Sequence, residues 1–144
     1  MGPRLLALVV FLLAVGCTTV NSLKPGVPRG VHESGFMKTT EGLSLKVANR
    51  SYDEVWAAAD RAIAAHLTVI DRNKERGILR GSDADTLGFI RSYVGIFISP
   101  VQSRAEFYTV EVSKIMRGRT HVIFTGPDFE VQLLRAIQAE VGGQ

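Results

Sequence analysis

One cysteine, Cys17, is the residue of this chain whose position most clearly predicts chemistry. It is the only cysteine among 144 residues, and it follows an apolar run, residues 5–15, and a single glycine, Gly16. Arg4 supplies a positive charge before the run. Small residues precede the cysteine where a peptidase could cut, and the thiol is placed where a lipid could be attached. We therefore expect cleavage between Gly16 and Cys17 and acylation of Cys17.

Two other interpretations of the first seventeen residues compete with this one. A transmembrane helix needs about 20 apolar residues to cross about 30 Å of hydrocarbon, and the run here is roughly half that length. An ordinary secretory signal ends in small residues, and Ala14 and Gly16 could serve that purpose with Cys17 left as a free thiol. A single cysteine in an exported protein calls for its own explanation, and acylation provides one.

The segment Leu13-Ala14-Val15-Gly16-Cys17 resembles the lipobox of bacterial prolipoproteins, in which cleavage occurs just before the cysteine. The resemblance implies two or three acyl chains on Cys17, which is enough for stable anchoring because a single chain binds only marginally. It also implies sorting to the outer membrane, since the next residue, Thr18, is not the aspartate that retains many such proteins at the inner membrane.

The rest of the chain lacks the residue patterns of common active sites. His32, His66 and His121 are far apart and have no partner at metal-ligand spacing. Neither a G-x-S-x-G nucleophile elbow nor a glycine-rich phosphate loop occurs. Asp83 and Asp85 begin like a calcium loop, but the later glycine and glutamate are missing. We expect a non-enzymatic protein without a metal or other cofactor.

The charge of the chain indicates no nucleic-acid partner. The net charge is +3 and no block of like charge occurs, so the basic footprint of a nucleic-acid-binding protein is missing.

Tyr93, Phe97 and Phe107 could line a pocket, although aromatic residues of strands more often fill the core. Residues 93–99 are apolar on both faces, which leaves open a second possibility, a small apolar ligand or lipid held between helix and sheet.

The chain divides into a signal, residues 1–16, a lipidated tether, residues 17–42, and a globular domain, residues 43–144. The tether is rich in Gly, Pro, Ser and Thr and shows no apolar periodicity. A flexible chain of about 25 residues spans roughly 25–30 Å, so the domain is expected to stand off the membrane. Phe36 and Met37 could dock on the domain, although isolated apolar residues in a tether are usually exposed.

The globular part is expected to be α+β, an antiparallel sheet of five to six strands with two helices on one face. A capping box, Ser51 to Glu54, begins the first helix, and Pro127 and Asp128 begin the second. The predicted order is β-α-β-β-β-β-β-α. Its elements are a strand over 43–47, a helix to about 66, a hairpin of 67–70 and 78–81, strands over 93–99, 108–113 and 120–125, and a final helix to about 141.

Residues 47–56 (VANRSYDEVW), 69–72 (VIDR) and 77–79 (GIL) resemble the modules of the BamC (NlpB) lipoproteins, which are accessories of outer-membrane protein assembly. The resemblance implies a helix-grip-like fold and no catalytic residue. It suggests a periplasm-facing outer-membrane lipoprotein that binds another envelope protein. The expected contact surface is an exposed sheet edge or the outer face of the second helix, because exposed edges accept an added strand.

Overall fold

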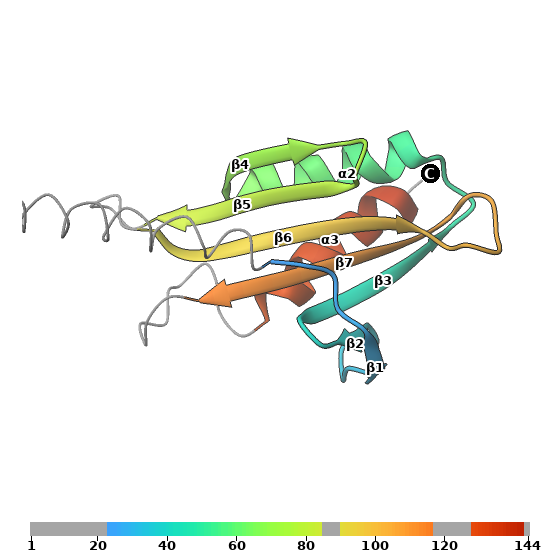
Figure 1. Cartoon of the computed structure of the whole chain (residues 1–144), viewed down its shortest axis with the longest axis horizontal. Coiled ribbons are helices and arrows are strands. Elements are labelled where there is room, and N and C mark those ends of the chain that lie inside the picture. Colours follow the sequence, from blue (N-terminus) through green and yellow to red (C-terminus); the bar gives the residue numbers. More distant parts are fainter. Residues whose placement is uncertain (1–22, 85–89, 117–127, 143–144) are drawn as a thin grey trace, which may run out of the picture.

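The computed structural model describes residues 23–84, 90–116 and 128–142, which form an antiparallel sheet and two helices (Figure 1). The expected α+β class is confirmed. The elements in chain order are β1 (Pro28–Val31), β2 (Met37–Thr39), β3 (Gly42–Ala48), α2 (Tyr52–His66), β4 (Thr68–Asn73), β5 (Ile78–Ala84), β6 (Ile90–Pro100), β7 (Phe107–Met116) and α3 (Phe129–Gly142).

The sheet has seven strands in the order β1-β2-β3-β7-β6-β5-β4, and every neighbouring pair is antiparallel. Its centre joins an early strand to a late one, because β3 pairs with β7 from Gly42 opposite Ser113 to Ala48 opposite Phe107. The edges are β1 and β4. The β4–β5 pair is the hairpin that the sequence predicts at residues 67–81.

Both helices lie on the same face of the sheet (Figure 1). Successive strand residues point to opposite faces, and Val94, Ile96 and Ile98 of β6 are buried against the helices. Trp56 of α2 is 9% exposed and belongs to the same core. This layer contains most of the buried apolar side chains of the described residues.

Helix α2 begins with the predicted capping box. The Ser51 hydroxyl accepts the amide proton of Glu54 at 3.3 Å, and the Ser51 amide donates to Glu54 Oε2 at 2.7 Å. These reciprocal bonds satisfy two of the amides that a helix start leaves unpaired. The pKa of the Glu54 carboxyl is lowered because the Ser51 amide and the Ser51 hydroxyl, the latter at 2.8 Å, both donate to Glu54 Oε2 and favour its charged form.

The tether prediction is wrong from Leu23 onward, because residues 23–42 are folded. Leu23 is 2% exposed and Phe36 is 6% exposed. β1 and β2 form a hairpin that extends the sheet beyond β3. Sequence patterns do not predict this hairpin, because the two strands have only four and three residues. A register shift between Pro28 and Gly30 also breaks the alternation of side chains between the two faces.

This hairpin also corrects the predicted strand number and order. The described residues hold seven strands, not five or six, in the order β-β-β-α-β-β-β-β-α. The strand predicted over 120–125 lies outside the described residues. The second helix begins at Phe129, one residue after Asp128, whose carbonyl accepts the first helical hydrogen bond from the Gln132 amide at 3.0 Å.

Candidate functional site

The two residues predicted to carry lipid attachment and cleavage, Cys17 and Gly16, lie outside the described residues. The described chain begins at Leu23, on the face of the sheet opposite the helices, and crosses that face to reach β1 (Figure 1). We call residues 23–27 the N-terminal strap and this side of the sheet the helix-free face. The strap is the described segment nearest to Cys17 along the chain.

The strap covers aromatic surface on the helix-free face. Leu23 packs with Tyr93 and Phe97 of β6 in a second, smaller apolar cluster. Gly95 lies between these two aromatics, and a Cβ there would come within 2.9 Å of the Phe97 ring and 3.5 Å of Leu23. Tyr93 and Phe97 therefore fill a core, as the sequence favours. Phe107 is half-buried, and the centre of its ring lies 5.3 Å from Cζ of the Arg104 guanidinium.

A buried carboxylate holds the strap and the first hairpin against β7. Glu111 is 4% exposed, and its Oε1 accepts the Gly26 amide at 2.6 Å and the Thr39 hydroxyl at 2.9 Å. Thr39 Oγ1 in turn accepts the Gly42 amide at 2.9 Å, which ties the end of β2 to the start of β3. Burial raises the pKa of Glu111, while the bonds from Gly26 and Thr39 oppose that shift.

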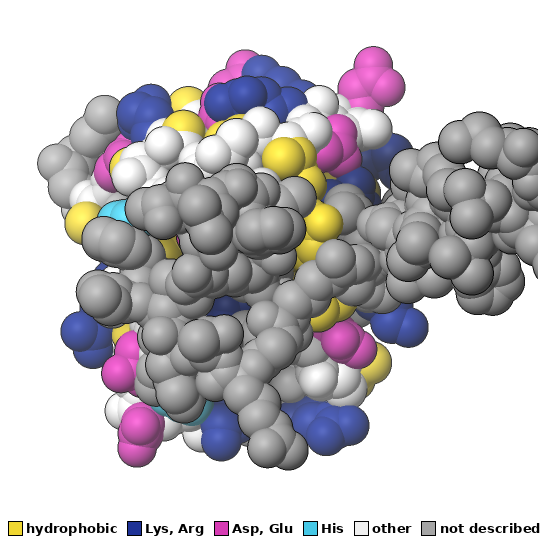
Figure 2. Space-filling view, turned by 90° about the vertical axis from the view of Figure 1, so that its left-hand side faces the viewer, with side chains coloured by type: hydrophobic (Ala, Val, Ile, Leu, Met, Phe, Trp, Pro, Cys, Tyr) yellow, Lys and Arg dark blue, Asp and Glu magenta, His cyan; other side chains and the backbone are white. Residues whose placement is uncertain are grey.

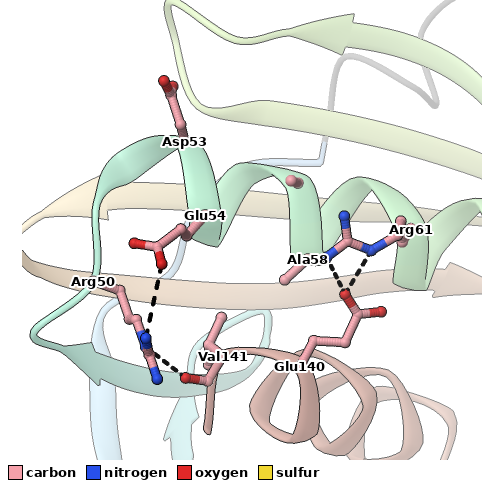
Figure 3. Close-up of a pocket in the computed structure, with 8 residues that line it drawn as sticks. Arg50, Asp53, Glu54, Ala58, Arg61, Glu140 and Val141 are labelled. Carbon is pink, nitrogen blue, oxygen red and sulfur yellow. Dashed lines mark hydrogen bonds and ion pairs between the residues drawn. The ribbon is translucent and has the colours of Figure 1, made fainter. Parts of the chain in front are cut away.

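A groove of about 310 Å³ lies between α2 and the end of α3 (Figure 3). Its charged groups bind one another. Arg50 Nε donates to the Val141 carbonyl at 2.7 Å, and Arg61 Nε donates to Glu140 Oε2 at 2.7 Å. Because a helix end carries unpaired carbonyls, the Arg50 contact caps α3. The groove therefore joins the two helices and presents no converging reactive groups.

A second hollow of about 400 Å³ lies between the β1–β2 turn and the start of α3, and His32 and Asp128 line it. His32 Nδ1 lies 2.8 Å from the Ser34 hydroxyl. His66, at the end of α2, packs edge-on against Phe129 with ring centroids 6.1 Å apart. His121 lies outside the described residues. In the part of the chain that the structure describes, no group of His, Cys, Asp and Glu could hold a metal ion.

One ion pair lies largely buried between sheet and helix. Lys114 Nζ of β7 is 3.5 Å from Glu130 Oε2 of α3, and the two side chains are 6% and 16% exposed. The ammonium also lies 6.0 Å from the centre of the Phe129 ring. The cost of desolvating two buried charges can exceed their mutual attraction, so we regard this pair as part of the β7–α3 contact without assigning it a gain in stability.

The described residues visible from the left-hand end of Figure 1 carry charges of both signs. Figure 2 shows Lys, Arg, Asp and Glu side chains spread around the rim of the molecule. This mixture agrees with the small net charge of +3. Among residues 23–84, 90–116 and 128–142, no helix has the length and apolar character required to cross a bilayer.

No protein-family model matches this chain, and a search of curated proteins found no match either. The site is therefore described from its own geometry. Sequence reasoning missed Glu111, which lies in the strand predicted over 108–113, and Leu23, which it placed in the tether. The sequence signal that could have indicated a covered helix-free face is the segment of residues 93–99, which is apolar on both faces.

Proposed function

We propose that this protein is a non-enzymatic lipoprotein, held at the periplasmic face of the outer membrane by lipid on Cys17, that binds another protein of the cell envelope. The position of Cys17 directly after the short apolar run and Gly16 carries the proposal. Lipid on the cysteine would confine the folded part to the membrane surface, where the partners available to it are other envelope proteins.

The BamC-like residues support an accessory role in envelope assembly. They form the end of β3, the capped start of α2, and the β4–β5 hairpin. We propose that these elements represent a single helix-grip-like module, in which α2 lies across the curved sheet. A module of this kind acts through its surface, in keeping with a binding role that requires no catalytic residue.

The β4 edge is the contact surface we favour. Among the described strands β4 pairs with β5 alone, so its other side offers backbone groups to an added strand. Ile70 is 43% exposed at the register shift between Val69 and Asp71, and it could enter a pocket on the partner. Arg72, paired with Asp60 at 2.8 Å, keeps charge on this edge and discourages non-specific pairing.

The alternative of an apolar ligand between helices and sheet receives no support from the described residues. Core side chains fill the space where that ligand was expected, with Ile63 of α2 and Ile96 of β6 fully buried. The two hollows described above lie at the surface, and charged side chains line both. We therefore base the proposal on protein binding.

Two measurements test the proposal. Palmitate labelling in cells should mark the wild type and fail for Cys17→Ala, which should also leave the membrane fraction. A photo-crosslinking residue at position 70 should capture a specific envelope protein, while the same residue at Gln138, on the exposed face of α3, should not. Unlabelled wild type refutes the anchor, and capture of bulk lipoproteins alone from position 70 refutes the binding surface.

A further inference from the structure

We propose that the helix-free face, with the N-terminal strap and the β1–β2 hairpin, is the membrane-facing surface of this protein, and that its partner is the lipid bilayer that holds the anchor. The inference rests on the lipid anchor proposed above. It fixes an orientation, with α2 and α3 directed away from the membrane.

The first argument is the length of chain between the anchor and the folded part. Five residues, 18–22, separate Cys17 from Leu23, and six residue steps at full extension reach about 20 Å. A domain of about 120 residues has a radius of gyration near 14 Å, hence a diameter of about 35 Å. Because the reach is shorter than the diameter, the side that carries Leu23 must stay near the bilayer.

The second argument is where Leu23 docks. It is 2% exposed and packs against Phe97 of β6, an interior strand of the sheet, on the helix-free face. The hydrogen bond from the Gly26 amide to Glu111 then holds the strap over β7. The folded part thus begins on the helix-free face, six residues after Cys17, and α2 and α3 occupy the opposite side of the sheet (Figure 1).

The third argument is what the hairpin exposes. Among the described residues three large hydrophobic side chains are exposed. Two of them lie in this region: Val27 of the strap is 70% exposed and Val31 of β1 is 68% exposed. Val31 pairs with Met37, which pairs with Ser44, so all three point to one face. Exposed Lys24 and Arg29 accompany them, and basic residues near an anionic membrane each contribute about 1 kcal/mol.

The test uses the full lipidated protein in vesicles of phosphatidylethanolamine and phosphatidylglycerol. A fluorophore is placed at Val31→Cys or, as the control on the helix side, at Gln138→Cys; lipid on Cys17 leaves the introduced thiol as the one to label. Quenchers on the lipid headgroups should quench the fluorophore at position 31 several-fold more than the one at position 138. Equal quenching, or the reverse order, would overturn the orientation.

A second variant tests the role of chain length. A flexible Gly/Ser linker of about 15 residues inserted after Thr19 adds roughly 20 Å of reach, and it should reduce the contrast between the two positions. An unchanged contrast would overturn the argument from chain length. Flotation of the protein with the vesicles separates the two proposals. Loss of flotation refutes the anchor and the orientation together, whereas flotation with equal quenching refutes the orientation alone.

Discussion

At the scale of single residues, Glu111 has the most consequential position. The residue is only 4% exposed, and its carboxylate accepts hydrogen bonds from the Gly26 amide and the Thr39 hydroxyl. Hydrogen bonds to charged groups contribute about 1.5–3 kcal/mol, and a buried donor left without its partner costs about 1–3 kcal/mol. Glu111 thus connects the strap, β2 and β7 through one side chain.

We expect Glu111→Ala to lower the free energy of unfolding by about 1–3 kcal/mol, because it leaves the Gly26 amide and the Thr39 hydroxyl without their acceptor. Glu111→Gln retains an acceptor oxygen and should cost less. Chemical denaturation at neutral pH measures both variants. Equal stability of the alanine variant and the wild type would show that these hydrogen bonds do not hold the strap.

The same residue gives a pH dependence of known sign. Burial raises the pKa of Glu111 above its value in the unfolded chain. The Glu111 carboxylate therefore binds a proton more tightly in the native state than in the unfolded state. The stability contributed by Glu111 then falls as pH rises from the unfolded pKa through the native pKa, by at most about 1.4 kcal/mol per pH unit. Glu111→Gln should therefore gain stability relative to the wild type between acidic and neutral pH, and a constant difference would contradict the assignment.

Residues differ in how far the sequence predicts their roles. Ser51 and Glu54 are predictable because a capping box is a local pattern four residues long. Glu111 and Gly26 are separated by 85 residues, so no local pattern connects them. Leu23 and Phe36 are single apolar residues in a stretch without periodicity, and tertiary contacts alone decide that they are buried.

At the scale of elements, the strap and the β1–β2 hairpin change what the N-terminal region does. The sequence predicts a free tether of about 25 residues, whereas the described part of that region is packed on the sheet. Strands β3 to β7 and both helices are predicted in type and chain order, although β4, β5 and β6 extend beyond their predicted bounds. The first two strands are too short and too irregular to show one.

We expect Leu23→Ala to destabilise the strap by about 2 kcal/mol, the lower end of the range for a buried leucine. The Gly26 amide, bonded to Glu111, should then exchange its hydrogen faster with solvent. Val27→Ala is the matched control, because Val27 is 70% exposed and its truncation should change little. Equal exchange rates in wild type, Leu23→Ala and Val27→Ala would indicate that residues 23–27 form a tether after all.

At the scale of the whole molecule, the contact between β3 and β7 joins the N-terminal strands to the rest of the sheet. Gly42 begins this contact, and a Cβ there would lie 2.0 Å from the Val112 carbonyl oxygen. A backbone atom so close cannot move aside without separating the two strands. This pairing of an early and a late strand is the part of the topology that sequence periodicity could not predict.

We expect Gly42→Ala to destabilise the protein by about 1–3 kcal/mol through this overpacking, with loss of the hydrogen bonds between β3 and β7. Gly142→Ala is the control, because no atom outside its own helix lies within 4 Å of a Cβ at that position. Thermal unfolding of both variants, together with amide exchange in β3, measures the effect. Equal melting temperatures for the two variants would contradict it.

The strand order also sets the sequence of events when the chain folds. Leu45 pairs with Val110, and closing so long a loop costs entropy before the contact contributes any stability. The neighbouring hairpins β4–β5 and β5–β6 need much shorter loops and can form first. β3 cannot join the sheet until residues 107–113, its partners in β7, are available for pairing. The strap cannot dock until β6 and β7 lie side by side, because Leu23 packs on β6 and Gly26 bonds to Glu111 of β7. The strap, residues 23–27, therefore docks late. Under the lipid anchor proposed above, this order would leave Cys17 accessible to processing enzymes while the remainder of the protein matures.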